Sequence, residues 1–395
     1  MLTFYGLGNI LGAGIYVLVG KVAGAAGMCT PLAFLIALLL ASFSAFSYAE
    51  LSARYPLSAG ESVYVHRGLR SRALALGVGL LIVLAGVLSA AAIVQGFVGY
   101  LQVLVAVPAR PAVAASALAL TAIAVWGIEP SARSAALVTL VEVFGLLLIV
   151  WVGRGALAEL PARAPELVPA FEPEAWHGVL FGALLAFYAF IGFEDMVNVA
   201  EEVRRPTRAL PAAILLALAV ATLLYLVVAL VAVMSLPPER LAQTDAPLAL
   251  IYREATGRPP ALISVVSMLA VINGALIQII MSARILYGLA HQLWLPPVFA
   301  RVHPVTRTPV LATVLSGGAV LILALAFAVE RLAEHTSVVI LMVFALVNLS
   351  LLRIKRRAPA PEGIRVFPYW VPVCGLVTSS GFVGFEVYNY LRWTP

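Results

Sequence analysis

Long apolar stretches dominate the chain, and polar residues gather in the short segments between them. A helix needs about 20 apolar residues to cross the ~30 Å hydrocarbon core of a bilayer. The stretches are continuous and do not alternate with a period of two, which indicates helices rather than a β-barrel. We therefore expect an all-α polytopic membrane protein with about eleven spans, at residues 2–23, 31–51, 74–105, 111–128, 135–153, 178–200, 210–236, 260–289, 309–328, 337–352 and 367–390.

Basic residues are unevenly divided between the two sets of loops. One set holds fifteen Lys and Arg residues in dense clusters, and the other set holds eight. Because cytoplasmic loops carry the excess of Lys and Arg, we expect a cytoplasmic amino terminus and a multi-pass protein of the plasma or inner membrane. The outer segments 154–176 and 236–258 are the longest loops, and we expect a surface helix in the second.

Composition excludes several classes of protein. The chain is 63% hydrophobic and 11% charged, whereas soluble domains carry about 25% charged residues. A soluble enzyme is therefore excluded, and no catalytic cluster is recognisable. The net charge of +6 does not indicate a nucleic-acid partner, because the basic residues do not share one polar face. Cys29 and Cys374 lie far apart without a CxxC pair, so we expect no metal site and no cofactor.

Two of the expected spans contain small or acidic residues that interrupt the continuous apolar helix. The first contains three small residues in a row, Gly12 to Gly14, and the sixth contains Gly192, Glu194 and Asp195. A charged side chain at the centre of a membrane helix costs roughly 2.5–3.5 kcal/mol. Small residues can instead serve close helix packing, and carboxylates near a helix end can reach water or cap the helix. We expect such a position near a helix end, in contact with water or as a cap, for Asp195 more than for Glu194.

The spacing of the interruptions predicts an inverted repeat. Four continuous spans separate the first from the sixth, so these two cross the membrane in opposite directions. We predict a 5+5 inverted-repeat fold with discontinuous helices 1 and 6. Its parts are a first repeat at 1–153, an extracellular loop at 154–176, a second repeat at 177–353, and a cytoplasmic basic loop with an eleventh helix at 354–395. Exposed amides at such breaks suit a carboxylate, and exposed carbonyls suit an ammonium group.

Four motifs carry a resemblance to a known family. They are GNILGAGIY at 8–16, YAELSARYPLSAGESVYVHRGL at 48–69, FYAFIGFEDMVNVAEEVRRPTRALP at 187–211, and NGALIQIIMSARILYGLAHQLWLPPVFARVHPVTRTP at 273–309. In this order they resemble the amino acid–polyamine–organocation transporters, including the cationic amino-acid permeases and the arginine/agmatine antiporters. Twelve helices are usual in that family. The sequence begins almost inside the first span, which leaves open that the true initiation site lies upstream.

The resemblance implies a substrate site made of backbone groups at the two breaks. In the first span, amides that bind the substrate carboxylate would come from Ala13, Gly14 and Ile15. In the sixth span, an aromatic gate and the carbonyls that bind the α-ammonium would come from Tyr188, Ala189, Phe190 and Ile191.

Side chains around this site are also implied by the resemblance. Gln278 in the eighth span would face the pocket, or else would form an interhelical hydrogen bond. Glu194 matches the acidic residue near the inner gate of the family. Asn273 and Ser282 are neighbours of Gln278 on plausible faces, and we assign Ser282 and Asn9 to gating or coupling.

The fifth span departs from the family. Many proton-coupled relatives carry a lysine there, whereas this chain has Glu142. A glutamate cannot replace the charge of a sodium ion, but it could load a proton. The alternative is a neutral, hydrogen-bonded glutamic acid that joins helices 1, 5 and 8.

These features together predict a secondary active amino-acid transporter that works by alternating access and is coupled to protons or to a counter-substrate rather than to sodium. Its expected partners are an amino acid, a proton or counter-substrate and the lipid bilayer, and the chain would act as a monomer or homo-oligomer. The apolar pocket favours a neutral substrate, whereas Glu194 would suit a cationic one. The alternatives are a polyamine or organic-cation transporter of the same fold, a solute channel, and an amino-acid sensor.

Overall fold

A computed structural model describes residues 2–57, 60–127, 132–359 and 361–393. All regular structure in these residues is helical, which confirms the predicted all-α class. The α-helices are α1 Leu2–Leu11, α2 Ala13–Ala26, α3 Thr30–Arg54, α4 Gly60–Leu69, α5 Arg72–Leu104, α6 Ala109–Trp126, α7 Ala132–Gly153, α8 Leu160–Arg163, α9 Pro173–Tyr188, α10 Pro206–Ser235, α11 Pro238–Ala242, α12 Pro247–Thr256, α13 Ala261–His291, α14 Val310–Ala326, α15 Val329–Arg357 and α16 Trp370–Trp393. The 3₁₀ helices are η1 Gly27–Cys29, η2 Arg154–Glu159, η3 Ala164–Leu167, η4 Glu194–Glu202 and η5 Pro297–Ala300.

The long helices have the length and surface of membrane helices. Among the described residues, eight helical stretches are long and apolar enough to cross a bilayer, and α14 is a shorter apolar helix. Large apolar side chains lie exposed on their outer faces, for example Leu118, Leu223 and Ile322, which are 58%, 66% and 67% exposed. Contact of these apolar side chains with lipid costs no free energy, whereas their exposure to water is unfavourable. The chain is therefore a multi-pass membrane protein.

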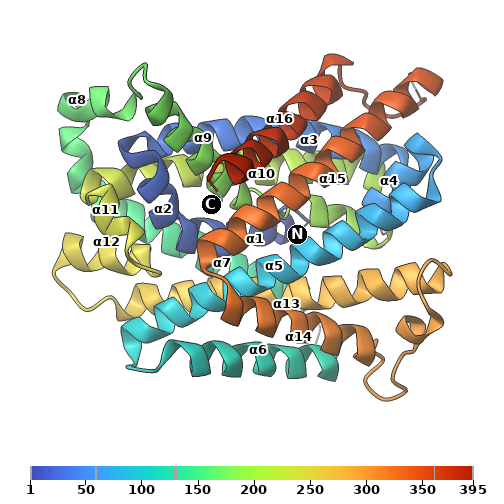
Figure 1. Cartoon of the computed structure of the whole chain (residues 1–395), viewed down its shortest axis with the longest axis horizontal. Coiled ribbons are helices and arrows are strands. Elements are labelled where there is room, and N and C mark those ends of the chain that lie inside the picture. Colours follow the sequence, from blue (N-terminus) through green and yellow to red (C-terminus); the bar gives the residue numbers. More distant parts are fainter. Residues whose placement is uncertain (1, 58–59, 128–131, 360, 394–395) are drawn as a thin grey trace.

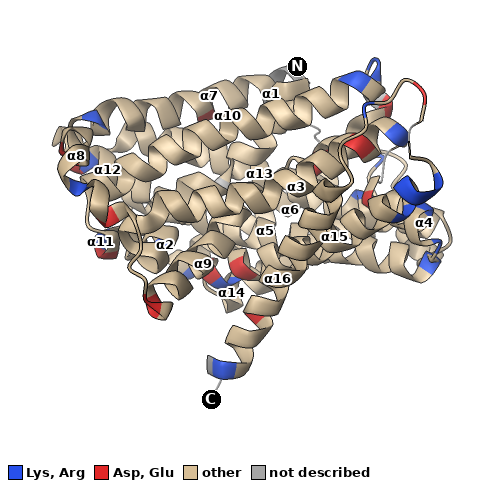
Figure 2. Ribbon diagram, turned by 90° about the horizontal axis from the view of Figure 1, so that it is seen from above, with Lys and Arg blue, Asp and Glu red and all other residues tan. Residues whose placement is uncertain are grey.

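The helices lie side by side along the long axis of the molecule (Figure 1). Helices α5 and α13 pack along each other near the centre, α6 and α14 pack against each other beside them, and α3 packs against α10. The short helices α8, α11 and α12 lie at one end, and α4 lies at the other end. Lys and Arg residues gather around α4 (Figure 2), as the clustering of basic residues in one set of loops predicted.

Two chain breaks meet inside the bundle. The first separates α1 from α2 at Gly12, and the second separates α9 from η4 at residues 189–193. An added Cβ at Gly14 would lie 2.2 Å from the Cα of Ala189, so only glycine lets the two breaks approach this closely. Gly192 has φ +124°, a conformation that side chains disfavour, and an added Cβ there would lie 2.5 Å from the carbonyl oxygen of Asn9.

The segment between α10 and α13 holds two short helices, α11 and α12, which confirms the surface helix expected in residues 236–258. Helix α12 buries Leu248 and Ile251 on one face and exposes Arg253 on the other. The inverted repeat, its boundaries and the orientation in the membrane stay predictions.

Candidate functional site

A cavity lies where the two breaks meet. Its walls come from α1, α2, α5, α13 and the break after α9, and they include Asn9, Gly14, Tyr188, Ile191 and Gln278, all of which the sequence analysis selected. The free volume is about 30 Å³, which is room for about two water molecules. A larger ligand therefore enters only when the walls move apart.

The amino-terminal end of α2 opens onto this cavity. The first amides of a helix have no partner within the helix, and no side chain caps α2 at Gly12. Gly14 lines the cavity, while Ile15 is fully buried and does not. The side chain of Ala13 lies outside the described residues. The free amides and the positive end of the helix dipole make this end a site for an anion such as a carboxylate.

The carboxyl-terminal end of α9 faces the same region. The turn after α9 is closed by 3₁₀ hydrogen bonds, such as the one from the amide of Ile191 to the carbonyl of Tyr188 at 3.2 Å. The Tyr225 hydroxyl of α10 donates to the carbonyls of Ala189 at 2.9 Å and Ile10 at 2.5 Å. Tyr225 thus joins both breaks, and the sequence analysis missed it because a lone tyrosine in an apolar span carries no signal.

The Tyr188 side chain closes one wall of the cavity. Its hydroxyl lies 2.9 Å from the Ser89 hydroxyl of α5, and it also donates to the Ser89 carbonyl at 3.3 Å. Phe190 instead points away from the cavity, because its ring packs edge-on against the rings of Phe34 and Tyr225. The break therefore turns one aromatic side chain toward the cavity and the other into the protein interior.

Asp195 lies in a different place from the one we expected. It is 7% exposed, it lines the cavity, and its carboxylate accepts a hydrogen bond from the Gln278 amide at 3.3 Å. The turn after Gly192 brings the start of η4 back toward α13, so Asp195 neither reaches water nor caps a helix. Glu194 does cap backbone, because its carboxylate accepts from the amide of Gly192 at 2.9 Å.

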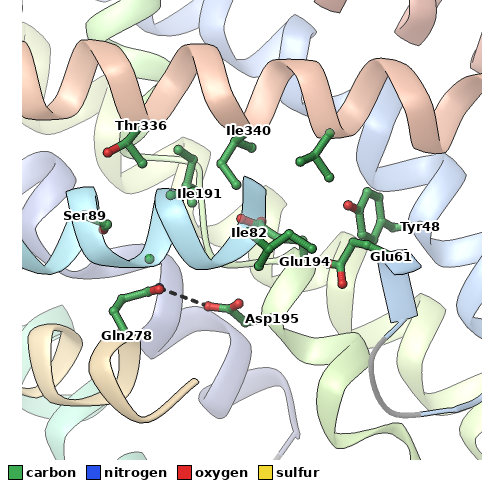
Figure 3. Close-up of a pocket in the computed structure, with 13 residues that line it drawn as sticks. Tyr48, Glu61, Ile82, Ser89, Ile191, Glu194, Asp195, Gln278, Thr336 and Ile340 are labelled. Carbon is green, nitrogen blue, oxygen red and sulfur yellow. Dashed lines mark hydrogen bonds between the residues drawn. The ribbon is translucent and has the colours of Figure 1, made fainter. Parts of the chain in front are cut away.

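A second cavity, of about 20 Å³, adjoins the first (Figure 3). The two share Ser89, Ile191, Asp195 and Gln278. The second adds the buried carboxyl groups of Glu61 and Glu194 and the Tyr48 ring, and no Lys or Arg is among the described residues that line it.

Glu61 lies on α4, outside the eight long apolar stretches. Burial raises the pKa of the Glu61 carboxyl to about 8, and the negative charge of Asp195 contributes to this rise. The Tyr48 side chain lies beside Glu61 in the same cavity (Figure 3). The described residues hold no group of three or more His, Cys, Asp and Glu side chains that is arranged to bind a metal ion.

Glu142 lies beside the first break and not in either cavity. It is fully buried on α7, and neither carboxylate oxygen has a hydrogen-bond partner among the described residues. An added Cβ at Gly8 of α1 would lie 3.5 Å from Oε2 of Glu142. The Tyr16 hydroxyl of α2 donates to the Glu142 backbone carbonyl at 2.5 Å. A carboxyl group thus lies buried where α1 and α7 meet.

Comparisons with known proteins identify the family. The profile of the amino acid permease family matches residues 1–389. The chain belongs to that family. A vacuolar cationic amino acid transporter 2 of Arabidopsis thaliana is 31% identical over 97% of this chain. A methylthioribose transporter of Bacillus subtilis is 28% identical over 96% of the chain, and a branched-chain amino acid permease of the same organism is 27% identical over 91%.

The chain spans 64% of the length of the Arabidopsis relative and 85% and 80% of the two Bacillus relatives. These relatives are named for three different classes of transported molecule, so membership in the family does not select the substrate.

The structure brings together some of the predicted site residues and not others. Those at a cavity are Asn9, Gly14, Tyr188, Ile191, Glu194 and Gln278. Ser282 is not among them, because its hydroxyl packs against α5 and donates to the Val83 carbonyl at 3.5 Å. Ser89, Asp195 and Glu61 line a cavity although sequence reasoning did not select them.

Proposed function

We propose that the chain is a secondary active amino-acid transporter of the plasma membrane, with a cytoplasmic amino terminus and two inverted repeats that alternate access to one site. The observation that carries the proposal is the meeting of an uncapped helix start, at α2, with a helix end, at α9, around one cavity. The first suits a carboxylate and the second suits an ammonium group. Both groups are present together in every free amino acid.

The experiment compares ligands that differ in one of these two groups. Purified protein in proteoliposomes is offered amino acids, their decarboxylated amines and their N-acetyl derivatives as competitors of uptake. We expect competition only from compounds with a free carboxylate and a free α-amino group. Equal competition by the amines would contradict the carboxylate site at α2, and the absence of any amino-acid uptake or exchange would contradict the transport proposal.

Tyr188 is the proposed gate. Its side chain lines the cavity and its hydroxyl lies 2.9 Å from the Ser89 hydroxyl. Tyr188→Ala removes the ring, so we expect weaker apparent affinity and leaky exchange. Tyr188→Phe and Ser89→Ala remove the same hydrogen bond from opposite sides, so we expect both to be mild and the double variant to add little. If Tyr188→Ala transports like the wild type, Tyr188 is not a gate.

Glu142 is the proposed proton site. Its two unpartnered, buried carboxylate oxygens support this role, because an ionised carboxylate is costly there and a proton removes the charge. Glu142→Gln mimics the protonated form. We expect the variant to lose the pH dependence of uptake while keeping substrate exchange. A full pH profile in the variant, or uptake driven by sodium, would leave Glu142 with a structural role.

The carboxyl groups of the second cavity favour a cationic substrate. Glu61, Glu194 and Asp195 line it, and it continues directly from the cavity at the breaks. The same observation favours the second candidate, a polyamine or organic-cation transporter. Arginine and citrulline have similar shapes and differ in charge, so we expect uptake to prefer arginine. Uptake of agmatine, which lacks the carboxylate, would favour the second candidate.

A further inference from the structure

A large cavity opens at the end of the molecule where α3, α4, α13 and α15 end. Its volume is about 780 Å³, within the usual range of small-molecule sites. It does not overlap the two cavities at the breaks, because it shares no lining residue with them. Figure 2 shows Lys and Arg residues gathered around α4 at this end.

Positive charge dominates the lining. Arg67, Arg70 and Arg357 contribute guanidinium groups and His66 contributes an imidazole, whereas the described lining contains no Asp or Glu. Arg357 donates to the backbone carbonyl of Arg67 at 3.3 Å, which holds the end of α15 against the end of α4. Three guanidinium groups that share one concave wall repel one another, and a bound anion would remove that repulsion.

The backbone adds to the positive field. Helix α5 is 33 residues long and begins at Arg72, two residues after Arg70, and Ser71 caps it by accepting from the Leu74 amide at 3.2 Å. The start of a long helix carries a partial positive charge. The partial charge at the start of α5 adds to the charge of the arginine side chains and is the smaller contribution.

Aromatic and apolar side chains form the rest of the wall. The guanidinium carbon of Arg67 lies 6.0 Å from the centre of the Tyr55 ring, and that of Arg72 lies 5.6 Å from the centre of the Trp294 ring. Leu57 lines the cavity and is 41% exposed, and Leu293, next to Trp294, is 75% exposed. Tyr and Trp beside exposed leucines are typical of the boundary between membrane and water.

We propose that this cavity binds a phosphate-bearing anion, supplied by the headgroup of an anionic phospholipid. Guanidinium groups bind a phosphate or a carboxylate through paired hydrogen bonds, and the exposed leucines beside them favour the phosphate of a lipid. Basic cavities between membrane helices on the cytoplasmic side suit such headgroups, and the exposed leucines would lie along the acyl chains. The bound headgroup would connect the ends of α3, α4, α13 and α15.

The test measures binding and not transport, so its result is independent of the proposed transport function. Full-length protein is titrated with vesicles of phosphatidylcholine that contain phosphatidylglycerol or lack it, and with inorganic pyrophosphate as a soluble phosphate. The pocket variant carries Arg67→Gln, Arg70→Gln and Arg357→Gln. The matched control carries Arg204→Gln, Arg205→Gln and Arg208→Gln, which removes the same charge from the residues just before α10 and from its first turn. Arg70 and Arg205 both have positive φ, so the two variants carry equal backbone strain.

We expect phosphatidylglycerol to be retained by the wild type at least fivefold more than phosphatidylcholine. The pocket variant should lose that preference, and the control should keep it within about twofold. If the triple variant does not fold, Arg70→Gln and Arg357→Gln alone should each lower retention, and Arg204→Gln should not. Equal loss in pocket and control variants would overturn the proposal in favour of general surface charge. Tight binding of pyrophosphate without lipid retention would assign the cavity to a soluble phosphate, and binding of neither probe would remove the site.

Discussion

The two ends of the molecule, which we call outer (at α11 and α12) and inner (at α4) after the predicted orientation, are each held by an ion network, and the two networks differ in construction. In the outer network, Lys21 of α2 lies 3.0 Å from Asp245 and 2.8 Å from Glu330, whose side chains are 57% and 37% exposed. In the inner network, Glu50 of α3 lies 2.6 Å from Lys355 and 2.7 Å from Arg54, and all three side chains are at most 4% exposed. One network is thus open to water and the other is not.

Solvent exposure decides what each network can do. Exposed ion pairs contribute about 0–1 kcal/mol, whereas breaking a buried pair costs about 3–5 kcal/mol. Glu50 is also fully partnered, because it accepts from the Phe367 amide at 2.9 Å. The outer network holds α2, one half of the broken first helix, and the inner network holds the continuous helices α3 and α15. We call the outer network of Lys21, Asp245 and Glu330 the latch, and the inner network of Glu50, Arg54 and Lys355 the joint. We expect the latch to open more easily than the joint.

The largest expected effect is at the inner joint. Glu50→Gln leaves Lys355 and Arg54 buried without an anion, so we expect a loss of about 3 kcal/mol or more in stability. Thermal unfolding in detergent measures it. Glu50→Gln combined with Lys355→Met should recover part of the loss, because only one buried cation, Arg54, then lacks an anion. A loss below about 1 kcal/mol would show that the joint is no stronger than the latch.

A pH titration sharpens the contrast, because Glu61 is a buried carboxyl at the inner end without a cation partner in the described structure. Burial raises the pKa of Glu61 to about 8, whereas the unfolded chain ionises near ~4.3. The folded protein therefore binds more protons between these values, and its stability falls as pH rises. Between pH 6 and 8 we expect a fall of about 2 kcal/mol. Glu61→Gln should remove this fall, and an unchanged pH profile would contradict the assignment.

Much of the architecture could be predicted from the sequence, and the reason is local. Apolar runs fix which segments form long helices, since the membrane leaves the backbone no other partner. The glycines at 14 and 192 mark the two breaks, because close approach demands the first and a positive φ demands the second. The ends of some helices differ from the prediction, as in α15, which begins at Val329 and not at residue 337, eight residues later.

The contacts between distant segments could not be predicted from the sequence. Glu50 and Lys355 are separated by 305 residues, and nothing in either motif specifies the other. Asp195 resembled a helix cap because its position along the chain is near a helix end. Its true neighbour, Gln278, is set by the turn at Gly192. Ser89 and Tyr225 are isolated polar residues in apolar spans, so only the packed structure gives them a partner.

The outer latch should respond to Lys21→Met with a moderate effect. Without the cation, Asp245 and Glu330 repel each other but are hydrated, so we expect a shift of about 1 kcal/mol toward the open outer side and little loss of stability. Cys29, which is 8% exposed just after α2, serves as a reporter in a Cys374→Ser background. We expect its alkylation rate to rise about fivefold in Lys21→Met, a change that about 1 kcal/mol produces. An unchanged rate would mean that the outer network does not hold α2.

The smallest effects should come from the two carboxylates of the latch taken singly. Each removal leaves Lys21 with one carboxylate partner. We therefore expect a shift of about 0.5 kcal/mol toward the open outer side and a rise of about twofold in the rate of Cys29 alkylation. Glu330→Gln should exceed Asp245→Asn, because Glu330 is less exposed and lies closer to Lys21. Salt near 1 M, where the screening length is about 3 Å, should erase the difference between these two variants. The same salt should leave the stability loss of Glu50→Gln unchanged, because water and ions do not reach the buried joint. If salt weakens both ends equally, exposure does not distinguish the latch from the joint.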